Sequence, residues 1–206
     1  MCGRFLLKSD LKEVVNTYNL RDCNYIQREF KGGEIFPSDL TPVITTDEKI
    51  KFLKWGFISK GNNKLVINAR SESISEKPLF KKALYTNRCV LPANCFYEWK
   101  GEKGKKQKYR ISVKGESIFS MAGIYDRFVD SKGLEYEGFV IITTEANYEM
   151  SSLHHRMPVI FKIGEEKSWL SEDIKEDFDL TSILKPYKNG ELLIVPDNGY
   201  EQTSFI

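Results

Sequence analysis

Near the start of the chain, the pattern of apolar and polar residues predicts a helix. Asp10, with Glu13 three residues later, forms a capping box, the arrangement that favours the first turn of a helix. The apolar residues that follow recur at helical spacing and so share one face: Leu11, Val14, Val15 and Tyr18. The sequence therefore predicts a short amphipathic helix that begins directly after Asp10.

Beyond this helix, short apolar stretches separated by turn residues indicate β-strands. A hairpin is predicted from residues 42–46 and 50–58, with the polar pair Asp47 and Glu48 at its turn. Further strands are predicted at 65–69, 89–91, 96–99, 109–113, 118–124, 139–144, 159–161 and 192–195. Short helices are predicted around 80–84 and between 165 and 184.

The order of these elements predicts the fold class. No linker rich in Pro, Gly or Ser divides the chain, and no segment of 20–50 residues repeats. Many strands with a few short helices are typical of an α+β protein. We therefore expect one domain over residues 1–206, built on curved antiparallel β-sheets or a barrel-like core, with short flanking helices.

Composition narrows the functional classes. With 41% hydrophobic and 13% aromatic residues, the chain has enough apolar material for a core, which excludes global disorder. Its 31 basic and 29 acidic residues leave a net charge of +2, too little for a uniformly basic nucleic-acid coat. Any anion site must therefore come from local clustering. Residues 100–110 hold six basic side chains and one acidic, and we interpret them mainly as a solvated hairpin loop; the acidic run at 165–179 is interpreted as a solvated helix face.

The sequence also bears on compartment and cofactors. The longest apolar runs are only a few residues long, and no apolar leader follows Met1, so neither a membrane span nor a signal peptide is expected. Four cysteines, with no C-x-x-C pair, fit a reducing cytoplasm better than a disulfide scaffold: Cys2, Cys23, Cys89 and Cys95. Zinc-ligand spacing is missing from the sequence, and we expect no metal and no cofactor.

Cys2 is the first candidate for chemistry. Removal of Met1 would leave an α-amine with a pKa of about 8 next to a thiol with a pKa of about 8.5. An aldehyde would form an imine with this amine, and the tethered thiol would then close a five-membered thiazolidine ring. An internal cysteine cannot do this, because its nitrogen is part of an amide. The alternative interpretation is that Cys2 has no role.

Three further segments carry candidate groups. Asn68 and Arg70 are two residues apart, so on an extended segment their side chains point to one face. Glu98 lies between aromatic residues, where burial would raise its pKa and suit it to general acid catalysis, although a strand pairing it with a lysine would look the same. His154 and His155 are the only histidines; we disfavour metal binding because adjacent side chains on extended backbone diverge.

The ordered set of segments resembles one family, the SOS-response-associated peptidase (SRAP) proteins. The segments that carry the resemblance are Cys2-Gly3-Arg4-Phe5, Trp55-Gly56, Asn68-Ala69-Arg70-Ser71-Glu72, Arg88-Cys89-Val90-Leu91-Pro92-Ala93, Phe96-Tyr97-Glu98-Trp99, Ala122-Gly123-Ile124-Tyr125 and His154-His155-Arg156-Met157-Pro158. The resemblance implies a SRAP-type fold with a positively charged groove for single-stranded DNA. It also implies a protein that shields abasic sites through a thiazolidine on Cys2, with autoproteolytic removal of Met1 and lyase-type activity.

The same resemblance implies roles for individual residues. Cys2 would be the nucleophile, Asn68 would orient it, Glu98 would be the acid–base catalyst and His154 would assist proton transfer. The residues implied in DNA binding are Arg4, Arg70 and Arg156, which would bind phosphates, and Trp55 and Trp99, which would stack on bases. The implied partner is single-stranded DNA with abasic sites, together with replication-fork proteins, and we expect a cytoplasmic monomer that associates with the nucleoid when bound to DNA.

Two other functions remain open at this stage. In an N-terminal nucleophile hydrolase, Cys2 would cleave amide substrates, but the arginines and tryptophans would have no task. In a reversible single-stranded nucleic-acid binding module, the basic run at 100–110 would bind the strand and Cys2 would be irrelevant. In addition, any lysine could form an imine with an abasic aldehyde, but an imine hydrolyses whereas a thiazolidine persists.

Overall fold

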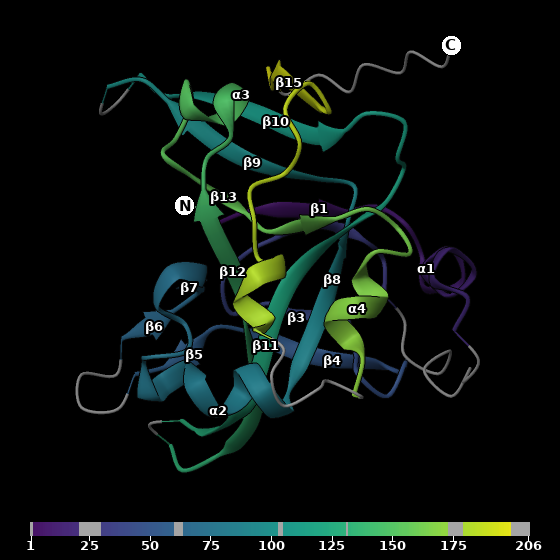
Figure 1. Ribbon diagram of the computed structural model, residues 1–206, viewed down its shortest axis with the longest axis vertical. Helices are drawn as coiled ribbons and strands as arrows, with labels where there is room; N and C mark the ends of the chain where they lie inside the picture. Colours follow the sequence, from purple (N-terminus) through teal and green to yellow (C-terminus); the bar gives the residue numbers. More distant parts are fainter. Residues whose placement is uncertain are drawn as a thin grey trace.

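Most of the regular secondary structure in the described residues is β-strand, and a few short helices pack around the strands (Figure 1). The computed structural model describes residues 2–20, 30–59, 64–102, 105–130, 132–172 and 179–198. None of the helices in these ranges is long and apolar enough to cross a membrane.

Five strands close into a barrel. They are β3 (Leu40–Thr45), β4 (Ile50–Trp55), β8 (Arg88–Ala93), β11 (Phe119–Val129) and β12 (Glu135–Glu145). Neighbours pair in the order β12-β4-β3-β8-β11, and β11 pairs again with β12 to complete the ring. The β12–β4 pair is parallel and the other four are antiparallel. A closed ring with an odd number of strands cannot alternate in direction throughout, so the expected barrel-like core is confirmed but is not purely antiparallel.

Three short strands extend this barrel. β7 (Asn68–Arg70) pairs in parallel with β12, β13 (Arg156–Pro158) pairs with β12, and β14 (Ile160–Phe161) pairs with β11. A separate two-stranded hairpin contains β5 (Phe57–Ile58) and β6 (Leu65–Val66). β7 and β13 bring two of the segments singled out in the sequence to the same barrel strand.

The second sheet has five strands in the order β15-β10-β9-β1-β2, all antiparallel. Their bounds are β1 (Phe5–Leu7), β2 (Gly33–Ile35), β9 (Cys95–Lys100), β10 (Gln107–Val113) and β15 (Leu192–Pro196). In Figure 1, the purple strand β1 runs across the upper ends of the barrel strands. The N-terminal segment thus becomes an internal strand of this sheet, between β9 and β2.

One core joins the two sheets. Phe5 from β1 contacts Trp55 edge-on, with ring centroids 5.3 Å apart, and Trp55 stacks on Phe139 from β12 at 6.1 Å. All three side chains are at most 1% exposed. Because burial of large aromatic side chains is strongly favourable, this contact fixes the N-terminal strand against the barrel.

The first helix is confirmed. α1 (Leu11–Tyr18) begins after Asp10, whose side chain accepts a hydrogen bond from the Glu13 backbone N–H at 2.8 Å. The other helical segments are α2 (Pro78–Thr86), α3 (Tyr148–Ser151), α4 (Glu166–Leu170) and two short 3₁₀ turns, Ser71–Ser73 and Leu180–Ile183. Helices were therefore correctly expected at 80–84 and within 165–184, and α3 was missed.

Of the two charged runs, the basic run lies where the sequence predicted it, and the acidic run is only partly solvated. The basic run does form the β9–β10 turn, where Gly101 has a positive φ of 124°, although residues 103 and 104 lie outside the described ranges. The acidic run is not simply a solvated helix face, because Glu166 is 3% exposed and accepts a hydrogen bond from the Gly164 N–H; residues 173–178 of this run lie outside the described ranges. Cys23 also lies outside them, whereas Cys2, Cys89 and Cys95 are buried thiols.

Candidate functional site

Cys2 lies between the two sheets. On one side, the Tyr97 N–H donates to the Arg4 carbonyl at 3.0 Å, which continues the β1–β9 pairing toward the N-terminus. On the other side, the Asn68 side-chain amide donates to the Cys2 carbonyl at 3.0 Å. The backbone of Cys2 is therefore bound to β7 of the barrel, while the residues that follow it pair with β9.

Burial controls the protonation of the Cys2 thiol. The residue is 0% exposed, and its Sγ donates to the Arg4 carbonyl at 3.7 Å. Burial, with a further contribution from the nearby Glu98 carboxylate, raises the pKa of the Cys2 thiol far above its ordinary value. At neutral pH the sulfur therefore holds its proton, and a reaction here needs a neighbouring group to accept it.

Glu98 reaches the same place from β9. Strand alternation puts it on the face opposite to Tyr97 and Trp99, and it is 4% exposed. Burial raises the pKa of the Glu98 carboxyl, so that the acid form persists to higher pH than in an ordinary glutamate. A carboxylic acid beside Cys2 can both donate and accept a proton, as expected from its position between aromatic residues.

Asn68 and Arg70 lie on β7, which runs parallel to β12 with Asn68 opposite Ile141. The Asn68 Oδ1 atom is buried and has no hydrogen-bond partner within the described part of the chain. Arg70 is exposed. Asn68 thus offers an acceptor next to Cys2, and Arg70 offers a positive charge at the surface.

His154 and His155 follow α3 and precede β13. The His154 Nδ1 accepts a hydrogen bond from the Arg156 N–H at 2.9 Å, and burial lowers the pKa of His154, so the neutral imidazole is favoured. The two rings stack with centroids 4.3 Å apart, so the expectation that they diverge is wrong: the chain turns here rather than running extended. The charge of His155 also affects the pKa of Glu98, which puts the histidine pair within electrostatic range of that carboxyl.

Arg156 does not point freely to solvent. Its guanidinium forms a bidentate ion pair with Glu72, with both N–O distances 2.8 Å, and donates to the Thr143 carbonyl at 2.7 Å. The ion pair holds the pKa of Glu72 below its ordinary value. A phosphate would have to compete with Glu72 for Arg156, and no pattern in the sequence indicated this pairing.

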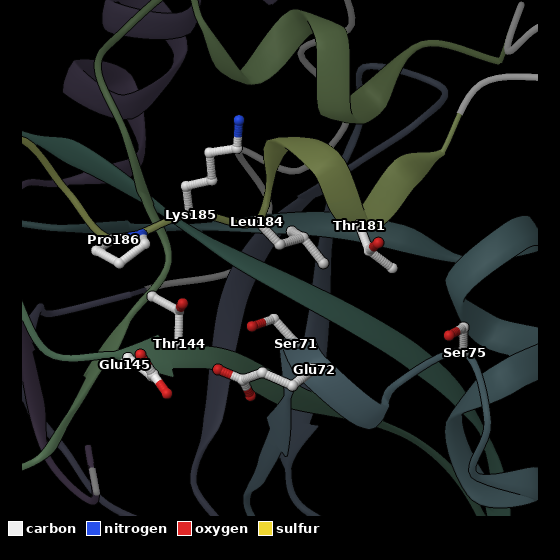
Figure 2. Close-up of a pocket in the computed structure, with 9 residues that line it drawn as sticks. All are labelled: Ser71, Glu72, Ser75, Thr144, Glu145, Thr181, Leu184, Lys185 and Pro186. Atoms are coloured by element: carbon white, nitrogen blue, oxygen red, sulfur yellow. The ribbon is translucent and has the colours of Figure 1, made fainter.

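A pocket of about 370 Å³ lies beside this ion pair. In Figure 2, Ser71 and Glu72 face Thr144 and Glu145 across the pocket, and Lys185 lies on the segment that covers it. Its lining combines polar residues with Leu184 and Pro186, and neither Cys2 nor Glu98 is among the lining residues. This pocket therefore adjoins the candidate site rather than forming its reactive centre.

The two tryptophans predicted to stack on DNA bases, Trp55 and Trp99, differ sharply in burial. Trp99 is half-buried at the surface of β9. Trp55 is 0% exposed, donates its indole N–H to the Ile67 carbonyl at 3.0 Å and stacks on Phe139. The expected stacking of Trp55 on DNA bases does not fit this position, because its ring faces are covered by the core.

Arg4, the remaining predicted phosphate ligand, is already engaged. Its Nη1 donates to Glu34 at 3.0 Å, and its guanidinium lies 3.6 Å from the Phe36 ring centroid. The structure therefore gathers Cys2, Asn68, Glu98 and the histidine pair at one site, while Arg4 and Trp99 lie on the other face of the sheet. Among the residues in the described ranges, no group of three or more His, Cys, Asp or Glu side chains could hold a metal ion.

Comparisons with known proteins give a consistent result. Residues 1–197 match the family described as SOS response associated peptidase (SRAP). The abasic site processing protein YoqW of Bacillus subtilis is 35% identical over 196 residues, covering 91% of this chain and 88% of its own. The abasic site processing protein YedK of Escherichia coli is 29% identical over 184 residues, covering 84% of this chain and 81% of its own.

A solved structure agrees with the fold. A crystal structure of a protein from Bacteroides thetaiotaomicron, 30% identical, superposes with a TM-score of 0.84 and covers 95% of this chain and 91% of its own. Its similarity extends over both the barrel and the five-stranded sheet, since it leaves only a twentieth of this chain unmatched. Given the family match over nearly the whole sequence and this likeness in fold, the chain belongs to the SRAP family.

Proposed function

We propose that this protein processes abasic sites in single-stranded DNA by forming a covalent crosslink through Cys2 after removal of Met1. The observation that carries the proposal is the position of Cys2, whose backbone is bound to Asn68 and whose thiol lies beside the buried Glu98 carboxyl. The names of the matched relatives, which are abasic site processing proteins, support the same substrate.

The proposed reaction starts at the open aldehyde of the abasic sugar. The Cys2 amine attacks the aldehyde carbon, and a proton moves from nitrogen to oxygen to give a carbinolamine. Protonation of its hydroxyl expels one water and leaves an iminium. The Cys2 sulfur then bonds to the iminium carbon, the thiol loses its proton, and a neutral thiazolidine results.

Each neighbouring group fits one of these steps. Glu98 in its acid form would protonate the sugar ring oxygen during ring opening and the hydroxyl that leaves as water. His154 would assist proton transfer through Nε2, which carries the ring proton of the neutral imidazole because Nδ1 accepts a hydrogen bond from the Arg156 N–H. The Asn68 side-chain amide, which donates to the Cys2 carbonyl, would hold Cys2 in place so that its amine and its sulfur both face the sugar.

We propose fewer DNA-binding residues than the sequence suggested. Arg70 is exposed and close to Asn68, and it is our first candidate for a phosphate flanking the lesion. Arg156 would bind a phosphate only in exchange for Glu72. We propose further that the protein acts as a cytoplasmic monomer that associates with DNA at replication forks.

The crosslinking test uses the purified full chain and an oligonucleotide with one abasic site. We expect a shifted band on a denaturing gel that survives without reductant, and its loss in Cys2→Ala. No borohydride is added, because without this reductant a lysine imine hydrolyses whereas a thiazolidine persists. An equal shifted band in wild type and Cys2→Ala would refute the proposal.

We also propose that the protein removes Met1 itself, as a peptidase, and this activity needs a separate measurement. A form with several extra residues before Cys2 cannot be trimmed by a methionine aminopeptidase in one step. Its intact mass should fall to that of a chain beginning at Cys2 if the protein removes the leader itself, and Glu98→Gln should retain the leader. Retention of the leader in the wild type would assign Met1 removal to a host enzyme and leave the crosslinking proposal standing.

A further inference from the structure

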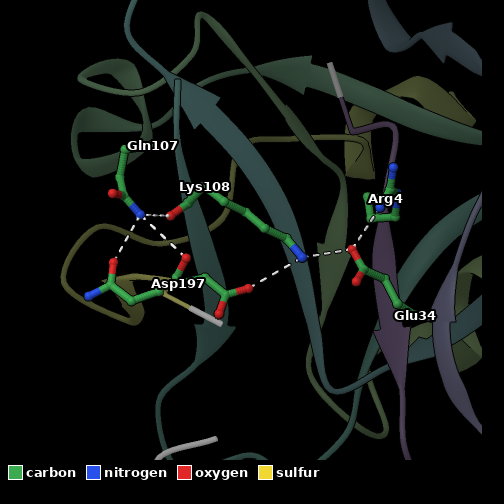
Figure 3. Close-up of polar contacts among 6 residues, drawn as sticks. Arg4, Glu34, Gln107, Lys108 and Asp197 are labelled. Atoms are coloured by element: carbon green, nitrogen blue, oxygen red, sulfur yellow. Dashed lines mark hydrogen bonds and ion pairs between the residues drawn. The ribbon is translucent and has the colours of Figure 1, made fainter. Parts of the chain in front are cut away.

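A cluster of ion pairs lies on the face of the five-stranded sheet opposite to Glu98. In Figure 3, the Glu34 carboxylate bridges two cations: its Oε1 is 3.0 Å from Arg4 Nη1 and 2.8 Å from Lys108 Nζ. Lys108 also contacts Asp197 Oδ2 at 3.3 Å. Glu34 lies on β2 and Lys108 on β10, while Arg4 directly precedes β1 and Asp197 directly follows β15, so the cluster spans most of the sheet.

Aromatic rings lie beneath both cations. The Arg4 guanidinium is 3.6 Å from the Phe36 centroid, and the Lys108 ammonium is 3.7 Å from the Tyr97 centroid. Both cations are also within 6 Å of the Trp99 ring, at 5.6 and 5.9 Å. Tyr97 is buried, whereas Phe36 and Trp99 are partly exposed. Cations beside exposed aromatic rings are an arrangement by which proteins hold single-stranded nucleic acid without reading its sequence.

The two carboxylates offset this positive charge. A phosphate that approaches Arg4 or Lys108 meets Glu34, whose oxygen already occupies the position between them. We propose that Glu34 competes with DNA phosphate on this face and thereby limits how tightly the protein holds the strand away from the abasic site. The inference rests on the proposed function in one respect only, the choice of single-stranded DNA as the partner.

Exposure makes such an exchange feasible. The side chains of Arg4, Glu34, Lys108 and Asp197 are between 22% and 29% exposed, so water reaches the cluster. Ion pairs in contact with water contribute little to stability, because solvent screens them. A phosphodiester brings the same single negative charge as Glu34, and its binding releases counterions from DNA, which favours the exchange at low salt.

The test measures binding of an intact, fluorescent single-stranded oligonucleotide by anisotropy at several salt concentrations. We expect Glu34→Gln to bind roughly three- to tenfold more tightly than wild type at low salt, with a salt slope steeper by about 0.7 for each additional phosphate that the protein neutralises. The matched control is Glu137→Gln, which also removes a partly exposed carboxylate from one arginine, Arg127, but on the β11–β12 pair. That control should shift affinity less than Glu34→Gln.

Lys108 provides a second test of the same idea. In the wild type, Lys108→Gln should change binding little, because two carboxylates already neutralise the ammonium. In the Glu34→Gln background, the same substitution should remove much of the increase in affinity. Melting temperatures of all variants show that they are folded.

Each result has a defined meaning. Binding by Glu34→Gln that is equal to or weaker than wild type, in a protein that melts normally, overturns the inference. The same holds if Lys108→Gln has equal effects in both backgrounds. Because the oligonucleotide has no abasic site, these outcomes are independent of crosslinking. If the abasic oligonucleotide of the crosslinking test gave no Cys2 adduct while Glu34→Gln still bound the intact strand more tightly, the proposed function would fail and this inference would stand.

Discussion

At the scale of single residues, burial determines which protons are available around Cys2. The pKa of the Cys2 thiol and that of the Glu98 carboxyl are both raised, mainly by loss of contact with water. The pKa of His154 is lowered for the same reason. At neutral pH the site thus favours protonated sulfur, a carboxyl that holds its proton to higher pH than usual and a neutral imidazole. Of these groups, the carboxylic acid is the one that acid-catalysed loss of water requires.

Replacing Glu98 by Gln tests the acid role. The amide has the same shape but cannot donate an acidic proton, so we expect the crosslinking rate to fall by about 10² or more. The measurement is the rate of adduct formation under single-turnover conditions, with Glu137→Gln as the control. A rate within twofold of wild type would remove Glu98 from the mechanism.

The same substitution should make the protein more stable at neutral pH. Because burial raises the pKa of Glu98 in the folded state, folding takes up a proton, and stability falls as pH rises from the unfolded pKa through the raised folded value. Each unit of that shift costs about 1.4 kcal/mol above the folded pKa. Glu98→Gln removes this cost, so its melting temperature should exceed that of wild type at pH 8 and the gap should close below about pH 4. A gap that is unchanged between those two pH values would contradict the burial argument.

Residue-level sequence reasoning reached some of the site. Cys2, Asn68, Glu98 and His154 could be proposed because their neighbours form an ordered set of motifs. The burial of Trp55 could not be predicted, because a tryptophan before a glycine looks the same whether its ring packs on Phe139 or faces solvent. Glu34 and Glu72 were missed because their partners lie 30 and 84 residues away in the sequence.

At the scale of elements, Arg88 joins two helices to the barrel. From β8, its guanidinium donates to the Leu84 and Tyr85 carbonyls near the end of α2, at 3.2 and 2.7 Å. It also donates to the Trp169 and Ser171 carbonyls around the end of α4, at 2.9 and 2.7 Å. The last carbonyls of a helix have no partner within it, so one buried side chain here satisfies acceptors from two helices.

Arg88→Met should therefore destabilise the protein without touching the reactive centre. Four carbonyls, two in buried and two in partly buried hydrogen bonds, would lose a charged donor, and we expect a loss of about 3 kcal/mol, or roughly 6–12 °C in Tm. The control is Arg127→Met, whose side chain is 82% exposed and should cost less than about 0.5 kcal/mol. Thermal unfolding of both variants decides the matter; equal melting temperatures would show that the Arg88 contacts contribute nothing.

Local signals explain which elements could be predicted. Helix α1 has its cap and its apolar face within nine residues, so the sequence alone identified it. Strands β1 and β2 have three residues each and were missed, because they are defined by pairing with each other and with β9 rather than by their own pattern. The long strands β11 and β12 were found but underestimated, since their outer ends lose the apolar pattern while still pairing.

At the scale of the whole molecule, the parallel β4–β12 contact closes the barrel. Gly56 follows β4, and its N–H donates to the Phe139 carbonyl at 2.8 Å. A Cβ on Gly138 would lie 2.6 Å from the Gly56 carbonyl oxygen. Two backbones approach each other here more closely than any residue with a side chain permits.

Gly138→Ala should consequently open this junction. We expect a loss of about 3 kcal/mol, at the upper end of the usual cost of overpacking, because the contact is with backbone and cannot be relieved by a rotamer change. Gly133→Ala is the control: it has a positive φ of 79° but nothing within 4 Å of its Cβ, so it should cost only about 1 kcal/mol. Denaturant unfolding compares the two, and an equal loss would show that closure is not under steric control.

The pairing of β1 with β9 also imposes an order on events at the ribosome. Leu6 lies opposite Cys95, so β1 lacks its β9 partner until 89 further residues have been made, although its other partner, β2, ends at Ile35 and is made much earlier. At 5–20 residues per second, this delay is roughly 5–20 s. For that time the β9 side of β1 has no partner strand, and pairing with β9 then makes β1 an internal strand of the second sheet.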